Sequence, residues 1–366
     1  MILERALRRE LTYTVGATFF VLLALVLTTM ISRIVGFAAL GEIDPCDVVV
    51  LVGLTMISYL AVMLIATLFI SILFVLTRWY RDSEMVIWLS SGMSLTQLIK
   101  PIIVFAAPVI GLITFFAFVG WPLANKQSKL IRDRFQQRDE VSLLVPGQFL
   151  TSTTNHRVFF IEKISLDQKR VENIFMTSTE NGQVNVVVSQ AAHTEIHSNG
   201  DRFVVLENGH RYSGELGKPD FRIMEFAHYG VKIQTQQLVN RRPTASSMST
   251  VALLSEPNNT NLAEFAWRTG LPLTALNLML LAIPLAYQNP RRSRMINLLL
   301  GVLIYLMYSN LMNLVQALIE QGTIGFLTGL LGLHLIVSAI VAFMFWLRVR
   351  NYLFLKRSAL RTGSRC

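Results

Sequence analysis

The sequence predicts an α-helical membrane protein whose six transmembrane helices flank, three on each side, an inserted all-β domain. The chain has 366 residues, of which 52% are hydrophobic and 15% charged, which is too apolar for an ordinary soluble protein. Apolar runs long enough to cross a bilayer lie on both sides of one polar block, residues 126–262. Within that block, short alternating segments separated by turn signals are typical of β-strands.

The first three spans are expected at residues 12–31, 48–76 and 101–119, the last loosened near Pro108. The loop at 41–47 contains acidic residues and no Lys or Arg. The basic residues that flank the first two spans gather at their other ends: Arg5, Arg8, Arg9, Arg78 and Arg81. Because cytoplasmic loops carry the excess of Lys and Arg, the N-terminus is expected in the cytoplasm.

The polar block is expected to form hairpins of a sandwich or jelly roll, with the domain extending over residues 123–262. Its strands are predicted at 157–164, 184–188, 202–206 and 220–226. Asn-Gly pairs suit two-residue hairpin turns, because both residues tolerate a positive φ. Such pairs occur at 181–182, 199–200 and 208–209.

The last three spans are expected at residues 271–287, 295–319 and 324–347, within a domain 263–366 that mirrors the helical domain 1–122. The loop 289–294 is strongly basic, 320–323 has no basic residue, and the C-terminal tail is basic. These charges predict that both termini are cytoplasmic and that the β domain lies outside, in the periplasm of a bacterial inner-membrane protein.

Several classes of function lack support. No G-x-x-x-x-G-K-[ST] loop occurs, so the chain is not expected to be an enzyme that hydrolyses nucleotide by that route. The net charge of +10 comes from basic groups beside apolar runs, which does not favour a nucleic-acid partner. Cys46 and Cys366 are expected on opposite sides of the membrane, and His193 and His197 would lie too far apart on a strand to share a metal. We expect no metal site and no cofactor.

The cytoplasmic stretch 82–92 is more than a connector. Asp82 or Ser83 can cap a short helix that begins near Glu84, and Gly92 can end it. Its apolar positions are Met85, Val86, Trp88 and Leu89. Two interpretations remain open: an amphipathic helix at the membrane surface, or a docking element for a soluble ATPase, with Glu84 at its tip.

Three further features could contact lipid or a neighbouring helix. Arg33 and Arg268 are expected at outer helix ends, where a cation either anchors the helix at the interface or binds an anionic head group. In the fifth span Ser309, Asn313 and Gln316 share one face, which would contact another helix or line a lateral opening. The spans offer no ionisable residue that sequence alone places near mid-membrane, so an ion-driven carrier is disfavoured.

Several stretches together resemble the Lpt permeases, membrane subunits of the ABC transporter that extracts lipopolysaccharide, and the F-type branch rather than the G-type. The matching stretches are 83–94 (SEMVIWLSSGMS), 146–149 (PGQF), 160–162 (FIE), 267–268 (WR) and 289–291 (NPR). Their order covers essentially the whole chain and includes the periplasmic β-jelly-roll domain.

The resemblance implies a heterodimer with a G-type permease paralogue on a homodimeric cytoplasmic ATPase, beside a bitopic C subunit with its own periplasmic jelly roll. It further implies that the segment around Glu84 is the coupling helix, and that lipopolysaccharide enters between the first and fifth spans of opposite permeases, near Arg33. Family members can carry a basic residue where this chain has Glu320. The alternative is a membrane-anchored β domain that binds a periplasmic partner in a structural or regulatory role.

Overall fold

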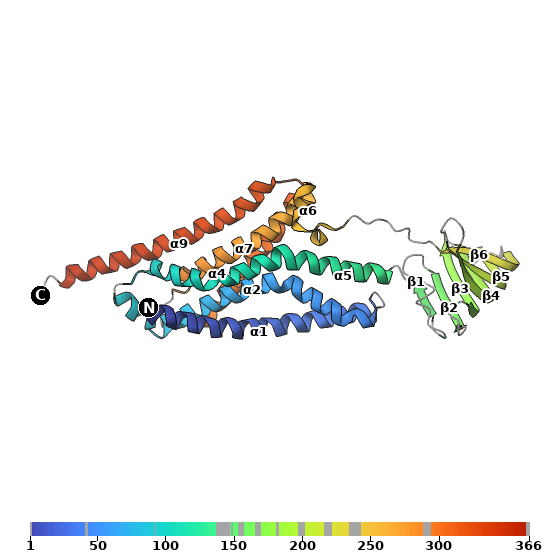
Figure 1. Cartoon of the computed structure of the whole chain (residues 1–366), viewed down its shortest axis with the longest axis horizontal. Helices are drawn as coiled ribbons and strands as arrows, with labels where there is room; N and C mark the ends of the chain where they lie inside the picture. The colour runs from blue at the N-terminus through green and yellow to red at the C-terminus, as the bar shows by residue number, and fades with distance from the viewer. Residues whose placement is uncertain are drawn as a thin grey trace. The chain divides into compact units, whose positions relative to one another are not determined.

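The computed structural model describes most of the chain in two compact units. The described ranges are 2–40, 43–91, 93–136, 147, 149–152, 157–164, 170–180, 183–196, 202–215, 222–233, 243–287 and 294–363. The helical unit comprises Met1–Arg132 and Pro243–Cys366, and the β unit comprises Asp133–Arg242. Figure 1 shows the long helices of the first unit and the single twisted sheet of the second.

The helical unit contains six helical segments long and apolar enough to span a membrane, which confirms the predicted fold class. Its helices are α1 (Ile2–Ala39), α2 (Val48–Arg81), α3 (Glu84–Ser90), α4 (Ile99–Phe115), α5 (Trp121–Gln136), α6 (Thr250–Ser255), α7 (Asn259–Leu285), α8 (Arg294–Glu320) and α9 (Phe326–Gly363). Short 3-10 turns occur at η1 (Pro45–Asp47), η2 (Leu95–Leu98) and η5 (Ala245–Ser247), and a π-helical turn, η3 (Phe116–Gly120), joins α4 to α5.

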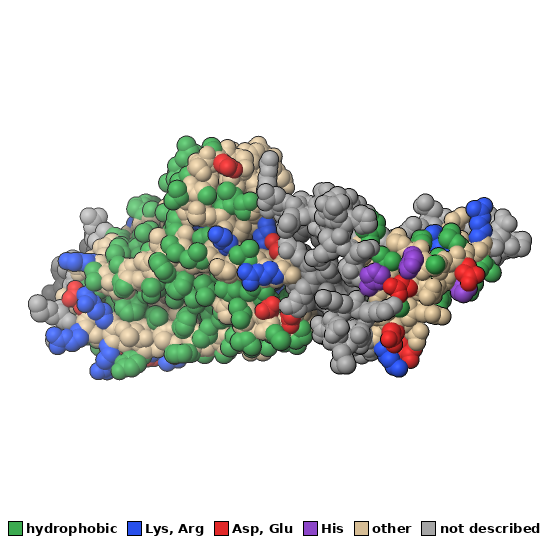
Figure 2. All heavy atoms as spheres, turned by 45° about the vertical axis from the view of Figure 1, so that its right-hand side comes forward, with side chains coloured by type: hydrophobic (Ala, Val, Ile, Leu, Met, Phe, Trp, Pro, Cys, Tyr) green, Lys and Arg blue, Asp and Glu red, His purple; other side chains and the backbone are tan. Residues whose placement is uncertain are grey.

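Helices α2 and α7 form the centre of the helical unit. About seven tenths of the apolar window of each is buried within the chain (72% and 67%), whereas the corresponding window of α1 is 0% buried and those of α8 and α9 are each 17% buried. Helix α7 packs on α2, α4, α8 and α9. Figure 2 shows the result, a helical unit whose visible face is covered largely by hydrophobic side chains. Helices α1, α8 and α9 therefore present apolar surface that only lipid or another protein can cover.

The helical unit extends further along the chain than the expected limits 122 and 263. Helix α5 continues the third span to Gln136, and α6 precedes α7 within the same unit. The third span was expected to loosen near Pro108, but Pro108 lies inside α4. Helical hydrogen bonding changes from the α to the π pattern eight residues further on, at η3. π-Turns are frequent at functional sites because they free a backbone carbonyl from its usual partner.

The β unit is one six-stranded antiparallel sheet with its strands in sequence order. The strands are β1 (Phe149–Ser152), β2 (Arg157–Ile164), β3 (Arg170–Glu180), β4 (Gln183–Ile196), β5 (Arg202–Glu215) and β6 (Arg222–Ile233). Alternate side chains on one face form its core, namely Ile174, Met176, Val187, Ala192, Leu206 and Phe226. Four of these strands overlap the predicted segments, whereas β1 and β3 were not predicted.

Strand β3 escapes sequence analysis because Asn173 interrupts its alternation. Asn173 has φ 52° and lies between the paired positions Glu172 and Ile174, so it takes a left-handed conformation that asparagine tolerates. Its side-chain amide donates to Glu162 of β2 at 2.6 Å. The irregular residue is thereby held within the sheet.

One of the three predicted Asn-Gly turns is wrong. Asn208 and Gly209 lie inside β5, not between strands, and Asn208 has φ 49°. A Cβ atom on Gly209 would clash with the Val188 carbonyl oxygen and come within 2.6 Å of the Phe226 ring. Glycine is required here for close backbone approach. The pairs at 181–182 and 199–200 lie outside the described residues, although Glu180 and Gln183, which flank the first, are paired.

Gly209→Ala should destabilise the β unit by about 1–3 kcal/mol, because the added methyl group overpacks the sheet. The measurement is thermal unfolding of the β unit in the full-length protein, followed by protease cleavage within residues 133–242. Gly230→Ala is the matched control, since the nearest atom to its added Cβ lies 3.9 Å away. Equal melting temperatures for the two variants would contradict this account of Gly209.

Candidate functional site

The predicted docking helix exists as α3, a two-turn helix set off from α2 by a sharp turn. Asp82 follows the end of α2, and Ser83 has φ 61°, a left-handed conformation that reverses the chain direction. The Ser83 side chain forms no capping bond to α3, and the Asp82 carboxylate accepts from Arg81 at 3.0 Å. The expected side-chain cap is therefore wrong, and the turn itself begins the helix.

The apolar residues of α3 are divided between its buried face and its exposed face. Met85 is completely buried, and Trp88 and Leu89 pack against the helical core. The apolar side chains that point outward are Val86 and Ile87, which are 55% and 68% exposed. Positions 85, 88 and 89 share one helical face, so the amphipathic spacing marks the side of α3 that rests on its own protein.

A capping box formed by Ser94 and Gln97 follows α3. In it, the backbone amide of Ser94 donates to the Gln97 side chain at 3.1 Å. It begins η2 and leads into α4. Gly92 lies outside the described residues. Glu84 remains half-exposed at the start of α3, 3.6 Å from Arg78 of α2.

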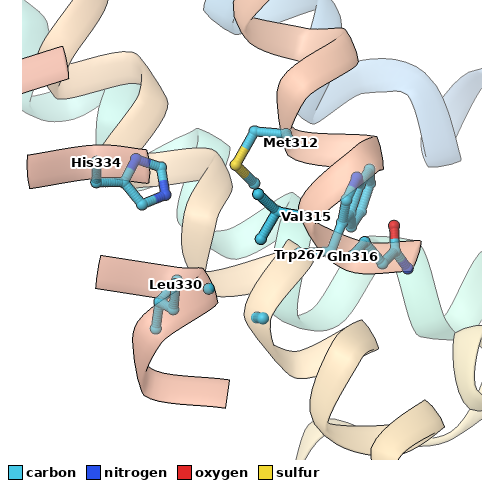
Figure 3. Close-up of a pocket in the computed structure, with 8 residues that line it drawn as sticks. Trp267, Met312, Val315, Gln316, Leu330 and His334 are labelled. Atoms are coloured by element: carbon cyan, nitrogen blue, oxygen red, sulfur yellow. The ribbon is translucent and has the colours of Figure 1, made fainter. Parts of the chain in front are cut away.

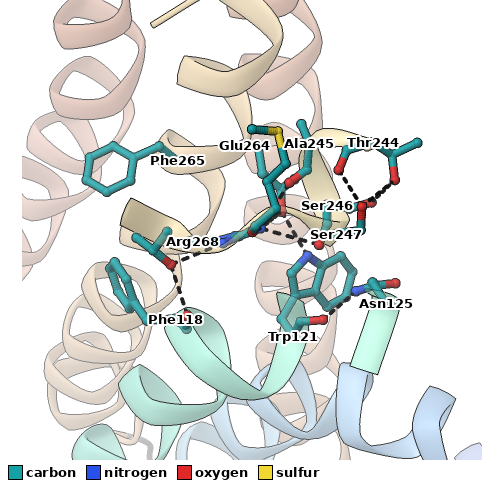
Figure 4. A network of polar contacts seen from close by, with 12 residues as sticks. Phe118, Trp121, Asn125, Thr244, Ala245, Ser246, Ser247, Glu264, Phe265 and Arg268 are labelled. Atoms are coloured by element: carbon teal, nitrogen blue, oxygen red, sulfur yellow. Dashed lines mark hydrogen bonds and ion pairs between the residues drawn. The ribbon is translucent and has the colours of Figure 1, made fainter. Parts of the chain in front are cut away.

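Figure 4 shows a buried polar network centred on an ion pair in α7. Arg268 is completely buried, and its Nε and Nη2 atoms each lie 3.0 Å from the Glu264 carboxylate one turn earlier. Glu264, only 4% exposed, also accepts from the indole of Trp121 at 2.8 Å. The negative charge is thus held by donors from α5 and α7, which offset the cost of burying it.

The remaining donors of Arg268 hold the segment that returns from the β unit. Its Nη2 atom donates to the carbonyl oxygens of Ala245, Ser246 and Met248, and its Nη1 atom donates to the Thr250 hydroxyl at 3.1 Å. Thr250 in turn donates to the Phe118 carbonyl oxygen, within η3, at 2.9 Å. One buried side chain therefore fastens η5, α6 and the π-turn to α7.

Both sequence interpretations of Arg268 placed it in contact with lipid, and the structure corrects them. A completely buried guanidinium whose nitrogens all have acceptors can neither anchor at a membrane surface nor meet a head group. Sequence analysis also missed Glu264, although its spacing of four residues from Arg268 is that of a helical ion pair.

Some polar residues of α8 contact neighbouring helices, and others are exposed. Gln316 is half-buried and donates to Glu264 at 3.4 Å, and Tyr305 donates to the Val62 carbonyl oxygen of α2 at 3.2 Å. Ser309 is half-buried and Asn313 exposed. Figure 3 shows Gln316 at one side of a small pocket between α7, α8 and α9. The pocket residues are Ala266, Trp267, Met312, Val315, Gln316, Gly329, Leu330 and His334.

A second buried polar group joins α7, α8 and α9. The Asn277 amide donates to the Tyr308 hydroxyl at 3.0 Å and accepts from Ser338 at 2.8 Å. The Tyr308 hydroxyl lies 2.6 Å from Nδ1 of His334, a residue that is 5% exposed. Sequence analysis did not identify His334. Together with Glu264 and Arg268 it shows that the span helices bury ionisable residues. The Nδ1 atom of His334 contacts Tyr308 of α8, whereas its buried Nε2 atom has no hydrogen-bond partner among the described residues.

Arg33 has the exposure that its expected role needs. It lies near the end of α1, exposed, with its guanidinium 5.8 Å from the centre of the Phe37 ring. The side chain next to it, Ile34, is buried against Ile43 and Leu51. That contact fixes this end of α1, while the cation beside it stays free to face lipid.

Comparison with known proteins gives the family. Residues 5–347 match the profile of the lipopolysaccharide export system permease LptF/LptG. The chain belongs to this permease family. Lipopolysaccharide export system permease protein LptF of Escherichia coli K12 is 28% identical over 313 residues, covering 84% of each chain, and LptF of Shigella flexneri matches to the same extent.

The family and the fold agree on the class of protein. Six apolar helices with an inserted antiparallel sheet form a multi-pass inner-membrane permease. The permease is a subunit of lipopolysaccharide export and a transporter component, not itself an enzyme. Its similarity to LptF supports the F-type resemblance seen in the sequence.

Loss of the charge on Glu264 should destabilise the permease strongly. Glu264→Gln leaves Arg268 buried without its counter-charge, and breaking such a pair costs about 3–5 kcal/mol. The measurement is thermal unfolding of the purified permease in detergent.

Glu256→Gln is the control, because Glu256 is exposed and isosteric surface changes stay within about 0.5 kcal/mol. The double variant Glu264→Gln with Arg268→Met should recover part of the loss, since it leaves no uncompensated charge. A Glu264→Gln protein as stable as the control would contradict the structural role of the pair.

Proposed function

We propose that the permease is the F-type half of a heterodimer with a G-type paralogue, driven by a separate homodimeric ATPase in the cytoplasm. It extracts lipopolysaccharide from the inner membrane and passes it, through its periplasmic jelly-roll domain and a bitopic C subunit with a similar domain, toward a periplasmic bridge. The observation that carries this proposal is α3, a short helix packed on the bundle that presents an acid and two exposed apolar side chains on its outward face.

The ATPase would bind the outward face of α3. Glu84 is half-exposed, and the neighbouring Val86 and Ile87 supply apolar contact area. Met85, Trp88 and Leu89 act from the inner face, where they pack α3 on the helical core. A push on the outer face is thereby carried into the bundle by close-packed side chains.

Lipopolysaccharide would enter where α1 of one permease faces α8 of the other. Both helices have apolar surface that their own chain leaves uncovered. Ser309, Asn313 and Gln316 lie along α8 as a polar face beside that surface, and Arg33 supplies an exposed cation at the outer part of α1 for a lipid phosphate. Glu320 at the end of α8 is also exposed, so a second phosphate contact is not proposed there.

The topology follows from the charges at the helix ends. We place both termini and α3 in the cytoplasm and the β unit in the periplasm, because basic residues lie in the last turn of α2, in the loop after α7 and in the last part of α9. The helical unit, Met1–Arg132 and Pro243–Cys366, would then carry the transport path, and the inserted β unit would receive what it releases.

Charge reversal of Glu84 tests the docking role. Glu84→Lys should reduce the ATPase that co-purifies with the permease and should lower ATP-driven extraction, because a cation replaces the acid that the ATPase is expected to bind. Glu256→Lys, an equally large charge change at another exposed site, should leave both unchanged. Normal extraction by Glu84→Lys would contradict the docking role of Glu84. Isolation of the permease without any ATPase would favour an anchored partner-binding protein instead.

Charge reversal of Arg33 tests the lipid contact. With a photo-crosslinker at Ser32, Arg33→Glu should lower crosslinking to lipopolysaccharide several-fold, and Arg33→Lys should retain most of it, since a lysine also binds phosphate as a point charge. The measured quantity is the crosslinked fraction. Unchanged crosslinking in Arg33→Glu would mean that Arg33 only anchors α1 at the interface.

A further inference from the structure

The cytoplasmic end of α1 is tied to the end of α2 by one carboxylate. Glu10 accepts from Nη2 of Arg78 at 2.6 Å with one oxygen and from the indole of Trp79 at 2.8 Å with the other. The flanking residues Leu7 and Leu11 are completely buried. Between this contact and the buried Ile34 near the other end of α1 lies the apolar window of the helix, which is 0% buried. At this end, α1 therefore moves with α2.

Arg78 faces three carboxylates at once. Its closest partner is Glu10 of α1, and the same Nη2 atom lies 3.6 Å from Glu84 of α3, while its Nε atom lies 3.8 Å from Asp82. Asp82 also has a closer cation of its own, Arg81, at 3.0 Å. Glu10 and Glu84 thus share a single guanidinium, and Glu10 holds the shorter contact.

The geometry points to Arg78 as a positioning residue that links α3, the docking helix, to α1, the span beside the proposed lipid entry. The carboxylates of Glu10 and Glu84 compete for its guanidinium. This inference rests on the proposed docking of an ATPase at α3 and adds the path by which docking reaches α1. The path is short: one carboxylate on α3, one guanidinium on α2 and one carboxylate on α1.

The competition gives the link a direction. A cation on the docked ATPase would neutralise Glu84, so the attraction that Glu84 exerts on Arg78 would fall and Arg78 would be left to Glu10. Docking would then tighten the hold on the cytoplasmic end of α1, and release of the ATPase would loosen it. All three side chains are partly exposed, so the effect is modest, as for other solvent-accessible ion pairs.

Hydrogen–deuterium exchange of the purified full-length permease, without any partner, tests the competition directly. Glu84→Gln should slow exchange of the α1 amides around residue 10 by about two- to fivefold, the factor expected of a partly exposed ion pair. It should also speed exchange within α3. Glu10→Gln should give the opposite signs, faster in α1 and slower in α3, because Arg78 is released to Glu84.

Arg81→Gln is the matched control, since the only acid within ion-pair distance of Arg81 among the described residues is Asp82. It should leave exchange around residue 10 unchanged. Reciprocal signs in the two Glu→Gln variants would support the link. Changes confined to the mutated helix in each variant, as a purely local structural role would give, would overturn it.

A second measurement uses the permease bound to its ATPase in membranes. Because Arg78 released from Glu10 then competes with the ATPase for Glu84, Glu10→Gln should lower the co-purified ATPase by no more than about two- to fivefold. It should also lower the lipopolysaccharide released per ATP hydrolysed by about two- to fivefold. An unchanged ratio would overturn the inference. A wild-type complex that hydrolyses ATP without releasing lipopolysaccharide would contradict the proposed function instead, and the exchange pattern of the permease alone would still decide whether Arg78 links α3 to α1.

Discussion

The buried ion pair of Glu264 and Arg268 determines how the end of the helical unit that connects to the β unit in sequence is held together. A charge pair inside a membrane protein is stable only when every donor and acceptor is matched, and here the matching groups come from α5, α6, α7, α8 and the segment 245–248. The π-turn η3 contributes as well, since the Phe118 carbonyl accepts from Thr250. The two chain segments that connect to the β unit are consequently fastened to the same helix.

The opposite end of the unit is built in another way. Its polar side chains are partly exposed, and two carboxylates, Glu10 and Glu84, share the guanidinium of Arg78. Fully matched buried contacts fix positions, whereas shared exposed ones can be redistributed by a partner at small cost in free energy. This difference suits the proposed roles of the two ends, in which a separate motor would act through α3 and the uncovered helices α1 and α8 would meet the substrate and the paralogue.

Hydrophobicity was sufficient to predict the six spans, because a bilayer allows few alternatives. Alternating segments between turn signals were sufficient to predict the inserted sheet. Sequence reasoning failed where one residue interrupts the alternation of a strand, and where an Asn-Gly pair inside a strand matches the signal of a hairpin turn. Strand β3 was not predicted because Asn173 interrupts its alternation, and a hairpin turn was wrongly predicted at Asn208, which lies inside β5. On α3, the spacing of Met85 identified the helix but not its outward face. The role of Arg268 depends on partners far away in sequence, at Trp121 and 245–250, which no local pattern reveals.

The central claim is that the docking helix and the β unit lie on opposite sides of the membrane. The most direct measurement is labelling with a membrane-impermeant maleimide in cells whose outer membrane has been made permeable. The test uses a chain with Cys46 and Cys366 replaced by serine. Glu225→Cys, at a position that is 84% exposed, should be labelled while the inner membrane is intact. Glu84→Cys should be labelled only after the inner membrane is opened. Labelling of both cysteines from the same side would contradict the account.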